Sequence, residues 1–138
     1  MNGLLVCKGE SFLKNIGDYI QSLAQEQYLG GNYCLVEREK LNSVDCTETI
    51  NVIMNGWFMW NPTNFPPSES VNPLFVSFHL NPAVADRFFT PETVGYLKKY
   101  EPIGARDLGT KSLMEEHGIE SYFSGCLTLT LGKTYKND

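Results

Sequence analysis

The sequence predicts an α/β protein, with a Rossmann-like, mostly parallel sheet and helices on both of its faces. Short apolar runs alternate along the chain with segments of helical periodicity. One strand-like run, Pro73–Phe78, is apolar on both faces, which is typical of parallel strands that helices cover on both sides. The length of 138 residues fits one compact domain, so residues 1–138 are predicted to form a single unit.

The first half of the chain contains four predicted strands and one predicted helix. Leu4–Cys7 is a short apolar run typical of a buried strand. Gly17–Leu29 carries apolar residues at helical spacing, and the adjacent Gly30 and Gly31 end that helix. Three further runs of β-branched and aromatic residues predict strands over Tyr33–Val36, Ile50–Phe58 and Pro73–Phe78.

The second half continues the same alternation. Thr90 is a capping residue directly before Pro91, and this pair predicts a helix that runs to Tyr100. The remaining elements are a short helix over Pro82–Phe89, a strand over Ile103–Arg106, a helix over Asp107–His117 that ends at Gly118, and strands over Ile119–Phe123 and Leu127–Leu131.

One connection, Met59–Asn72, is long and holds three prolines together with Trp60 and Phe65. Loops of this length are often lids or binding loops. The alternative is a proline-stiffened loop whose aromatic side chains pack onto the edge of the domain.

Charge and hydropathy exclude two classes of partner. The net charge is −5, and residues 1–70 carry 4 basic against 8 acidic side chains while the rest carry 7 against 8. Neither half offers a basic face, so nucleic acid is not an expected partner. The apolar runs are far shorter than the ~20 residues of a membrane span, and the first residues lack a signal-peptide pattern. We therefore expect a soluble, cytoplasmic protein.

The four cysteines give no metal or disulfide pattern. Cys7, Cys34, Cys46 and Cys126 are widely scattered, without a CxxC pair. Only two histidines are present to join them as soft ligands. Buried, reduced thiols are therefore expected, with no metal site and no cofactor.

Candidate ligand contacts follow the strands, because ligands of parallel sheets bind beyond the carboxyl ends of the strands. Asn15, Gly17 and Asp18 form the turn before the first helix, where backbone amides can hold an anion or a hydroxyl-rich ligand. Plain helix capping by Asn15 or Asp18 is the alternative. Asn55, near the end of the third strand, offers an amide side chain, or else marks a bulge or tight turn.

Later strand ends carry His79, Arg106, Ser124 and Thr128. His79 is a candidate for donating to an anionic oxygen or moving a proton, although a lone histidine is also a common structural residue. Arg106 suits bidentate binding of a carboxylate or phosphate, unless it only pairs with a nearby acid. Hydroxyls of Ser124 and Thr128 can contact a ligand, and a tight strand connection explains them equally. Nothing nearby marks Cys126 as an activated nucleophile.

Six segments, in their order and spacing, resemble the polysaccharide pyruvyl transferase family. They are NIGDYIQSLA at 15–24, VEREKLN at 36–42, NGWF at 55–58, FVSFHL at 75–80, PIGARD at 102–107 and GIESYFSGCLTLTL at 118–131. The family has two Rossmann-like halves in a GT-B-like arrangement and moves the enolpyruvyl group of phosphoenolpyruvate onto sugar hydroxyls, which forms a pyruvate ketal. The chain resembles the N-terminal half only.

The resemblance also implies roles for residues. Arg106 would bind the phosphate or carboxylate of phosphoenolpyruvate, His79 would be the catalytic polar contact, and the turn at Asn15–Asp18 would line the cleft. The family's second half supplies further cationic and acid/base groups, including a histidine that protonates the enolpyruvyl methylene. The first half alone is therefore expected to bind its anionic ligand, with a sugar as a possible second one, without complete catalysis.

Two other readings stay open. The chain is alternatively a stand-alone, non-catalytic module that binds or sequesters a small phosphorylated or nucleotide-like ligand. In that case a homo-oligomer would replace the missing second domain. A purely structural or protein-interaction role is the third hypothesis.

Overall fold

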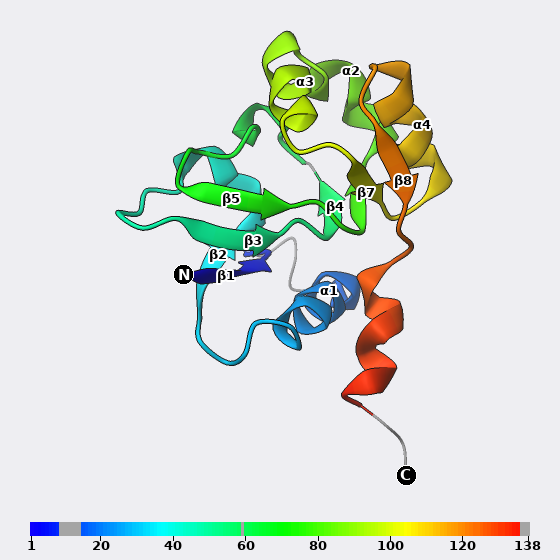
Figure 1. Ribbon diagram of the computed structural model, residues 1–138. Helices are drawn as coiled ribbons and strands as arrows, with labels where there is room; N and C mark the ends of the chain where they lie inside the picture. Colours follow the sequence, from blue (N-terminus) through cyan, green and yellow to red (C-terminus); the bar gives the residue numbers. More distant parts are fainter. Residues whose placement is uncertain (9–14, 59, 136–138) are drawn as a thin grey trace.

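The computed structural model describes residues 1–8, 15–58 and 60–135, and it contains two parallel sheets (Figure 1). The first sheet has the order β2-β1-β3-β5 and the second the order β4-β6-β7-β8. The strands are β1 Asn2–Val6, β2 Tyr33–Glu37, β3 Ile50–Ile53, β4 Gly56–Phe58, β5 Val71–Leu74, β6 Phe78–Leu80, β7 Ile103–Ala105 and β8 Ser121–Phe123. Every described pairing is parallel, which confirms the predicted Rossmann-like α/β class.

The two sheets join where the chain passes from β3 to β4 and from β5 to β6. Across these breaks Met54 N–H donates to the Leu74 carbonyl at 2.8 Å and Gly56 N–H to the Ser77 carbonyl at 3.1 Å. Gly56 has φ +106° and Ser77 has φ +58°, so each turns its strand out of the regular pleat. The single strands predicted over Ile50–Phe58 and Pro73–Phe78 are therefore wrong. The tight turn that was the alternative account of the Asn55 segment is present.

Helices lie on both faces of the sheets, as predicted. The α-helices are α1 Ile16–Glu26, α2 Ala85–Phe88, α3 Pro91–Lys98 and α4 Leu108–Glu116, and the 3-10 helices are η1 Arg38–Ser43, η2 Pro62–Asn64, η3 Pro82–Val84 and η4 Leu127–Lys133. Figure 1 shows α1 and η4 together on one side of the sheets and α2 and α3 on the opposite side. Asn15 caps α1, Thr90 caps α3 and Asp107 caps α4.

The strand predicted over Leu127–Leu131 is wrong, because this segment forms η4 against α1. Gly125, at φ +71°, turns the chain away from β8. Gln27 at the end of α1 then donates to Thr130 Oγ1 at 2.8 Å and accepts from Thr134 Oγ1 at 3.0 Å. These side-chain bonds hold the segment beside the helix, where it has no strand to pair with.

The buried apolar core takes in strands of both sheets and side chains of the helices α2 to α4. Phe58, Phe78 and Phe88 are fully buried, and the Phe58 and Phe78 rings stack at 4.7 Å. Burying each such side chain stabilises the fold by about 1.5–3 kcal/mol. Phe65 from the long connection is also buried and packs on Phe88 at 4.9 Å, whereas Trp60 is 53% exposed. The proline-rich connection thus packs onto the core through Phe65.

Candidate functional site

Polar side chains gather in two places at the carboxyl-terminal ends of the strands. The first, here called the Arg38 cluster, consists of Cys7, Asn15, Asp18, Arg38 and Glu39. It lies where β1 is flanked by β2 and β3, the point at which the strand order reverses. The second, the His79 cluster, consists of His79, Arg106, Asp107 and Thr110 at the end of β6 and the start of α4.

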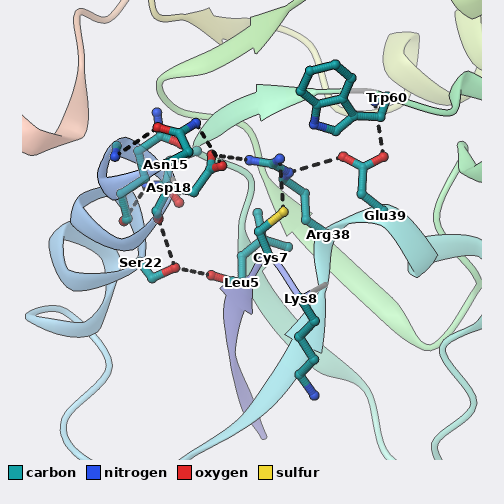
Figure 2. Close-up of polar contacts among 12 residues, drawn as sticks. Leu5, Cys7, Lys8, Asn15, Asp18, Ser22, Arg38, Glu39 and Trp60 are labelled. Carbon is teal, nitrogen blue, oxygen red and sulfur yellow. Dashed lines mark hydrogen bonds and ion pairs between the residues drawn. The ribbon is translucent and has the colours of Figure 1, made fainter. Parts of the chain in front are cut away.

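A buried ion pair is the centre of the Arg38 cluster (Figure 2). Arg38, directly after β2, places Nη1 2.8 Å from Asp18 Oδ1 in the first turn of α1. The same guanidinium contacts Glu39 Oε1 through Nε at 3.3 Å and donates to Cys7 Sγ through Nη2 at 3.2 Å. Both partners of the main pair are buried, with 4% and 6% of their side chains exposed. The pair therefore fastens α1 to the ends of β1 and β2.

Four of the sequence-predicted ligand contacts lie in or beside this cluster. Asn15 Oδ1 accepts from the Gly17 N–H at 3.1 Å, and Asn15 Nδ2 donates to Asp18 Oδ2 at 3.0 Å. Asn55 is buried and donates to the Gln21 carbonyl on α1 at 2.9 Å. Among the described residues these side chains cap and anchor α1, which is the capping alternative that the sequence left open.

Little space remains inside the Arg38 cluster. The cavity bounded by Asp18, Arg38 and Asn55 has a volume of about 10 Å³, which is room for about one water molecule. A neighbouring cavity of about 80 Å³ lies between Cys7, Asp18 and Tyr19. Burial raises the pKa of the Cys7 thiol to about 12, against the opposing effect of the Arg38 charge, so this cysteine is a neutral thiol near pH 7.

The His79 cluster has a different geometry. Asp107 caps α4, with Oδ1 accepting from the Thr110 N–H at 2.8 Å. Its other oxygen, Oδ2, lies 2.5 Å from His79 Nδ1 and 3.9 Å from Arg106 Nε. One carboxylate oxygen therefore positions both the imidazole and the guanidinium that the sequence singled out. Arg106 keeps 24% of its side chain exposed and His79 21%.

The electrostatics keep His79 neutral and Asp107 charged. Burial lowers the pKa of His79 below its ordinary value and the positive charge of Arg106 adds to this effect, while the hydrogen bond to Asp107 acts in the opposite direction. For Asp107, burial raises the pKa, but the Thr110 N–H and the His79 imidazole outweigh it and the net shift is downward. At neutral pH the pair is an imidazole held by a carboxylate.

A cavity of about 310 Å³ opens beside this pair, between β6, η3 and α4. Its lining includes His79 and Asp107, the apolar side chains of Leu80 and Leu113, and the carboxylate of Glu116. Arg106 is not among the lining residues. The cavity thus carries two carboxylates and no lysine or arginine.

Ser124 and Thr128 are not brought into either cluster. Ser124 Oγ accepts from the Ser77 N–H at 2.9 Å and donates to the Ala105 carbonyl at 3.0 Å, so it joins the ends of β6, β7 and β8. Thr128 lies in the first turn of η4, where its Oγ1 is 3.0 Å from Sγ of the N-cap residue Cys126. The tight-connection alternative fits Ser124, because both of its bonds go to backbone.

Sequence reasoning gave no role to Arg38, which the structure places at the centre of one cluster. The available signal was a cation directly after a strand, in a segment already noted for its family resemblance. Its partner Asp18 lies 20 residues earlier in the chain, so only the fold shows that the two charges meet. Thr110 was also missed, because its role depends on the cap that Asp107 makes.

The family comparison agrees with this architecture. The family model described as Polysaccharide pyruvyl transferase matches residues 15–138. The chain belongs to the polysaccharide pyruvyl transferase family. No curated protein and no solved structure matches the chain. The pyruvyl transferase match includes both clusters, apart from Cys7.

Membrane-spanning helices and metal sites are both absent from the described part of this family member. None of its helices combines the length and the apolar character needed to cross a bilayer. Within residues 1–8, 15–58 and 60–135, no three histidine, cysteine, aspartate or glutamate side chains are grouped as a metal site would require. All four cysteines are free thiols of intermediate exposure.

Proposed function

We propose that this chain acts in pyruvyl transfer, with Arg106 binding phosphoenolpyruvate and His79 taking a proton from a sugar hydroxyl. The observation that carries the proposal is the geometry around Asp107 Oδ2, which lies 2.5 Å from His79 Nδ1 and 3.9 Å from Arg106 Nε. Family membership supplies the reaction class. The geometry supplies one group for the anion and one for the proton.

The reaction itself sets what these groups must do. Two sugar hydroxyl oxygens form bonds to C2 of the enolpyruvyl group, and the bond from C2 to the phosphate oxygen breaks. Of the two hydroxyl protons, one is needed to convert the methylene to a methyl group, and the other leaves with phosphate. A base near the hydroxyl and a cation near the departing phosphate both stabilise the transition state.

His79 is suited to the base role. Its Nδ1 donates to Asp107, which leaves the lone pair of the neutral ring on Nε2. Burial keeps the ring neutral near pH 7 by lowering its pKa. Thr110 Oγ1 lies 3.3 Å from Nδ1 of His79 and helps to hold the ring in place. Asp107 then stabilises the imidazolium that proton transfer creates.

Arg106 is suited to the anion role. In the described part of the chain Asp107 is the one carboxylate within ion-pair distance of its guanidinium, at 3.9 Å. That distance is too long for a hydrogen bond, so the contact with Asp107 orients the guanidinium and does not occupy its N–H donors. Guanidinium donors match the oxygens of a phosphate or carboxylate in pairs.

The charges around Asp107 favour different substrates on its two sides. The cavity beside His79 is lined by Asp107 and Glu116 and by no cationic lysine or arginine, so it disfavours an anion and favours a neutral sugar. Phosphoenolpyruvate is better placed on the Arg106 side of the pair. Both sites then meet at the Asp107 carboxylate.

Binding of phosphoenolpyruvate by calorimetry tests the proposal. We expect saturable binding, and Arg106→Lys should weaken it roughly 10- to 100-fold, because paired charge-assisted hydrogen bonds are lost. Arg87→Lys makes the same change at an exposed arginine and should leave the affinity unchanged. His79→Asn should retain phosphoenolpyruvate binding. An affinity that does not change in Arg106→Lys and Arg106→Ala would exclude the proposed anion site.

Three expectations from the sequence stay predictions. They are the GT-B-like pairing of two Rossmann-like halves, a homo-oligomer in place of a second domain, and a nucleotide-like ligand in place of phosphoenolpyruvate. Titration with nucleotides beside phosphoenolpyruvate, together with the mass of the particle in solution, distinguishes them.

A further inference from the structure

Arg106 and His79 share one carboxylate oxygen. Asp107 Oδ2 lies 2.5 Å from His79 Nδ1 and 3.9 Å from Arg106 Nε, so a permanent cation and a ring that can become one are held against the same atom. The guanidinium and a protonated imidazole repel each other and compete for that oxygen. Protonation of His79 therefore depends on how far the charge of Arg106 is neutralised.

The charges that face His79 come from two of its neighbouring elements. Within the described residues, β4, β7 and α4 pack against β6, which carries His79. Strand β4 contains no titratable side chain, and β7 leads directly into Arg106. Helix α4 contributes Asp107 at its N-cap and Glu116, which lines the same cavity as His79. One guanidinium is thus set against two carboxylates around the ring.

Arg106 makes His79 harder to protonate. Burial is the main cause of the lowered pKa of His79, and the positive charge of Arg106 lowers it further, against the hydrogen bond to Asp107. An oxyanion on the guanidinium would neutralise the charge that opposes protonation. It would leave the hydrogen bond between the imidazole and the carboxylate in place, because that bond uses Nδ1 of the ring and no donor of Arg106.

We propose that binding of an oxyanion at Arg106 and protonation of His79 are coupled, so that each favours the other. The bound anion neutralises the guanidinium, and Asp107 then acts on the imidazole without a competing cation. By thermodynamic linkage, protonation of His79 strengthens anion binding by the same factor. The inference rests on the anion site of the proposed function, and it concerns the regulation of that site.

The coupling gives the two substrates an order. Without the anion, His79 is neutral and a weak base. Phosphoenolpyruvate at Arg106 increases the affinity of His79 for a proton, so the imidazole accepts the proton of a sugar hydroxyl more readily once the donor is bound. Proton removal from the sugar is therefore favoured in the complex that can use it.

The test follows the imidazole signals of the ¹³C,¹⁵N-labelled chain by NMR between about pH 8 and about pH 4.5. Sulfate is the probe, because it keeps its double charge over this range, whereas the phosphate group of phosphoenolpyruvate titrates within it. Saturating sulfate should raise the pH midpoint of His79. The second histidine, His117, is the internal control: it lies at the C-cap of α4, stacked on Phe89 at 3.8 Å, and its midpoint should not move. The spectrum of His79→Asn assigns the signals.

Removing the charge of Arg106 imitates the bound anion. In Arg106→Gln the midpoint of His79 should rise without sulfate, and sulfate should move it no further. Arg106→Lys retains a positive charge, so His79 should titrate closer to its midpoint in the unchanged chain. The matched control Arg87→Gln removes an exposed arginine of α2 and should leave the midpoint where it is. Circular dichroism spectra check the folding of each variant.

Calorimetry measures the coupling from the side of the anion. Sulfate should bind about fivefold or more tightly at about pH 5 than at about pH 7.5, and His79→Asn should lose most of this difference. The proposal is overturned if sulfate does not bind, if it binds without moving the midpoint of His79, or if Arg106→Gln titrates like the unchanged chain. Failure of phosphoenolpyruvate to bind would instead overturn pyruvyl transfer alone, because sulfate and Arg106→Gln test the coupling without it.

Discussion

Arg38→Met is the substitution whose effect the structure defines most sharply. Methionine retains much of the apolar stem of arginine and removes the guanidinium. Asp18 then keeps its hydrogen bond from Asn15 Nδ2 but loses the cation 2.8 Å from Oδ1. Since only 6% of the Asp18 side chain is exposed, water does not replace the lost partner.

The magnitude follows from that burial. Removing one partner of a buried pair leaves an uncompensated charge and costs about 3–5 kcal/mol of unfolding free energy. In a domain of this size the loss corresponds to a fall of roughly 10–17 °C in melting temperature. Adding Asp18→Asn to Arg38→Met removes the stranded charge, so the double variant should recover at least about 1 kcal/mol over Arg38→Met alone.

Urea unfolding followed by far-ultraviolet circular dichroism measures these differences, with the midpoint as the readout at unchanged slope. The control is Lys111→Met, which breaks the ion pair with Glu115 on the surface of α4, where 30% and 50% of the side chains are exposed. That change should cost less than about 0.5 kcal/mol. If the double variant is no more stable than Arg38→Met, the stranded-charge argument is wrong. A cost for Arg38→Met equal to that of Lys111→Met leads to the same conclusion.

Two further predictions concern pH and backbone packing. The pKa of His79 lies below its ordinary value of 6.5, so its contribution to stability is complete above that pH and is lost as pH falls through the lower folded-state value. The loss in urea midpoint between about pH 7.5 and about pH 5 should therefore be smaller in His79→Asn, and an equal loss in both proteins would contradict this. Gly104→Ala should destabilise the protein by about 1–3 kcal/mol, because the new Cβ would lie 2.8 Å from the Phe75 carbonyl oxygen. Gly95→Ala should instead stabilise it by up to about 1 kcal/mol, because Gly95 lies in α3 and a Cβ there would meet no atom within 4 Å. Thermal unfolding of both glycine variants checks the sign.

The sequence predicted the fold class well because burial on both faces leaves continuous apolar runs, and the runs survive in the structure as strands. It did not predict where the runs break. Apolar residues continue from β3 into β4, and the only signal for the break was Asn55-Gly56, for which a tight turn was the alternative interpretation. Ser77 adopts φ +58° although serine does not demand it, so the second break leaves no signal in the residue pattern.

The sequence singled out His79 and Arg106 at strand ends, and the structure brings both side chains to Asp107, while their binding and catalytic roles stay predictions. His79 lies within β6 and Arg106 directly follows β7, and these strands are parallel neighbours, so their meeting at Asp107 follows from the topology. Arg38 also directly follows a strand, but its burial depends on Asp18 from α1. A pair of buried charges brought together by tertiary packing leaves no periodicity in the sequence.

The two clusters also differ in how accessible their charged side chains are. The reversal point of an open parallel sheet is the usual ligand crevice, and here that point is occupied by Arg38, whose guanidinium contacts Asp18, Glu39 and Cys7 around a cavity of about 10 Å³. A ligand anion there would have to displace Asp18 and leave that carboxylate buried without its cation, which costs several kcal/mol. His79 and Arg106 instead keep 21% and 24% of their side chains exposed, and His79 lines a cavity of about 310 Å³. In the described part of the chain, the Arg38 cluster therefore fixes α1 against the sheet, and our proposal of pyruvyl transfer uses the more accessible groups around Asp107.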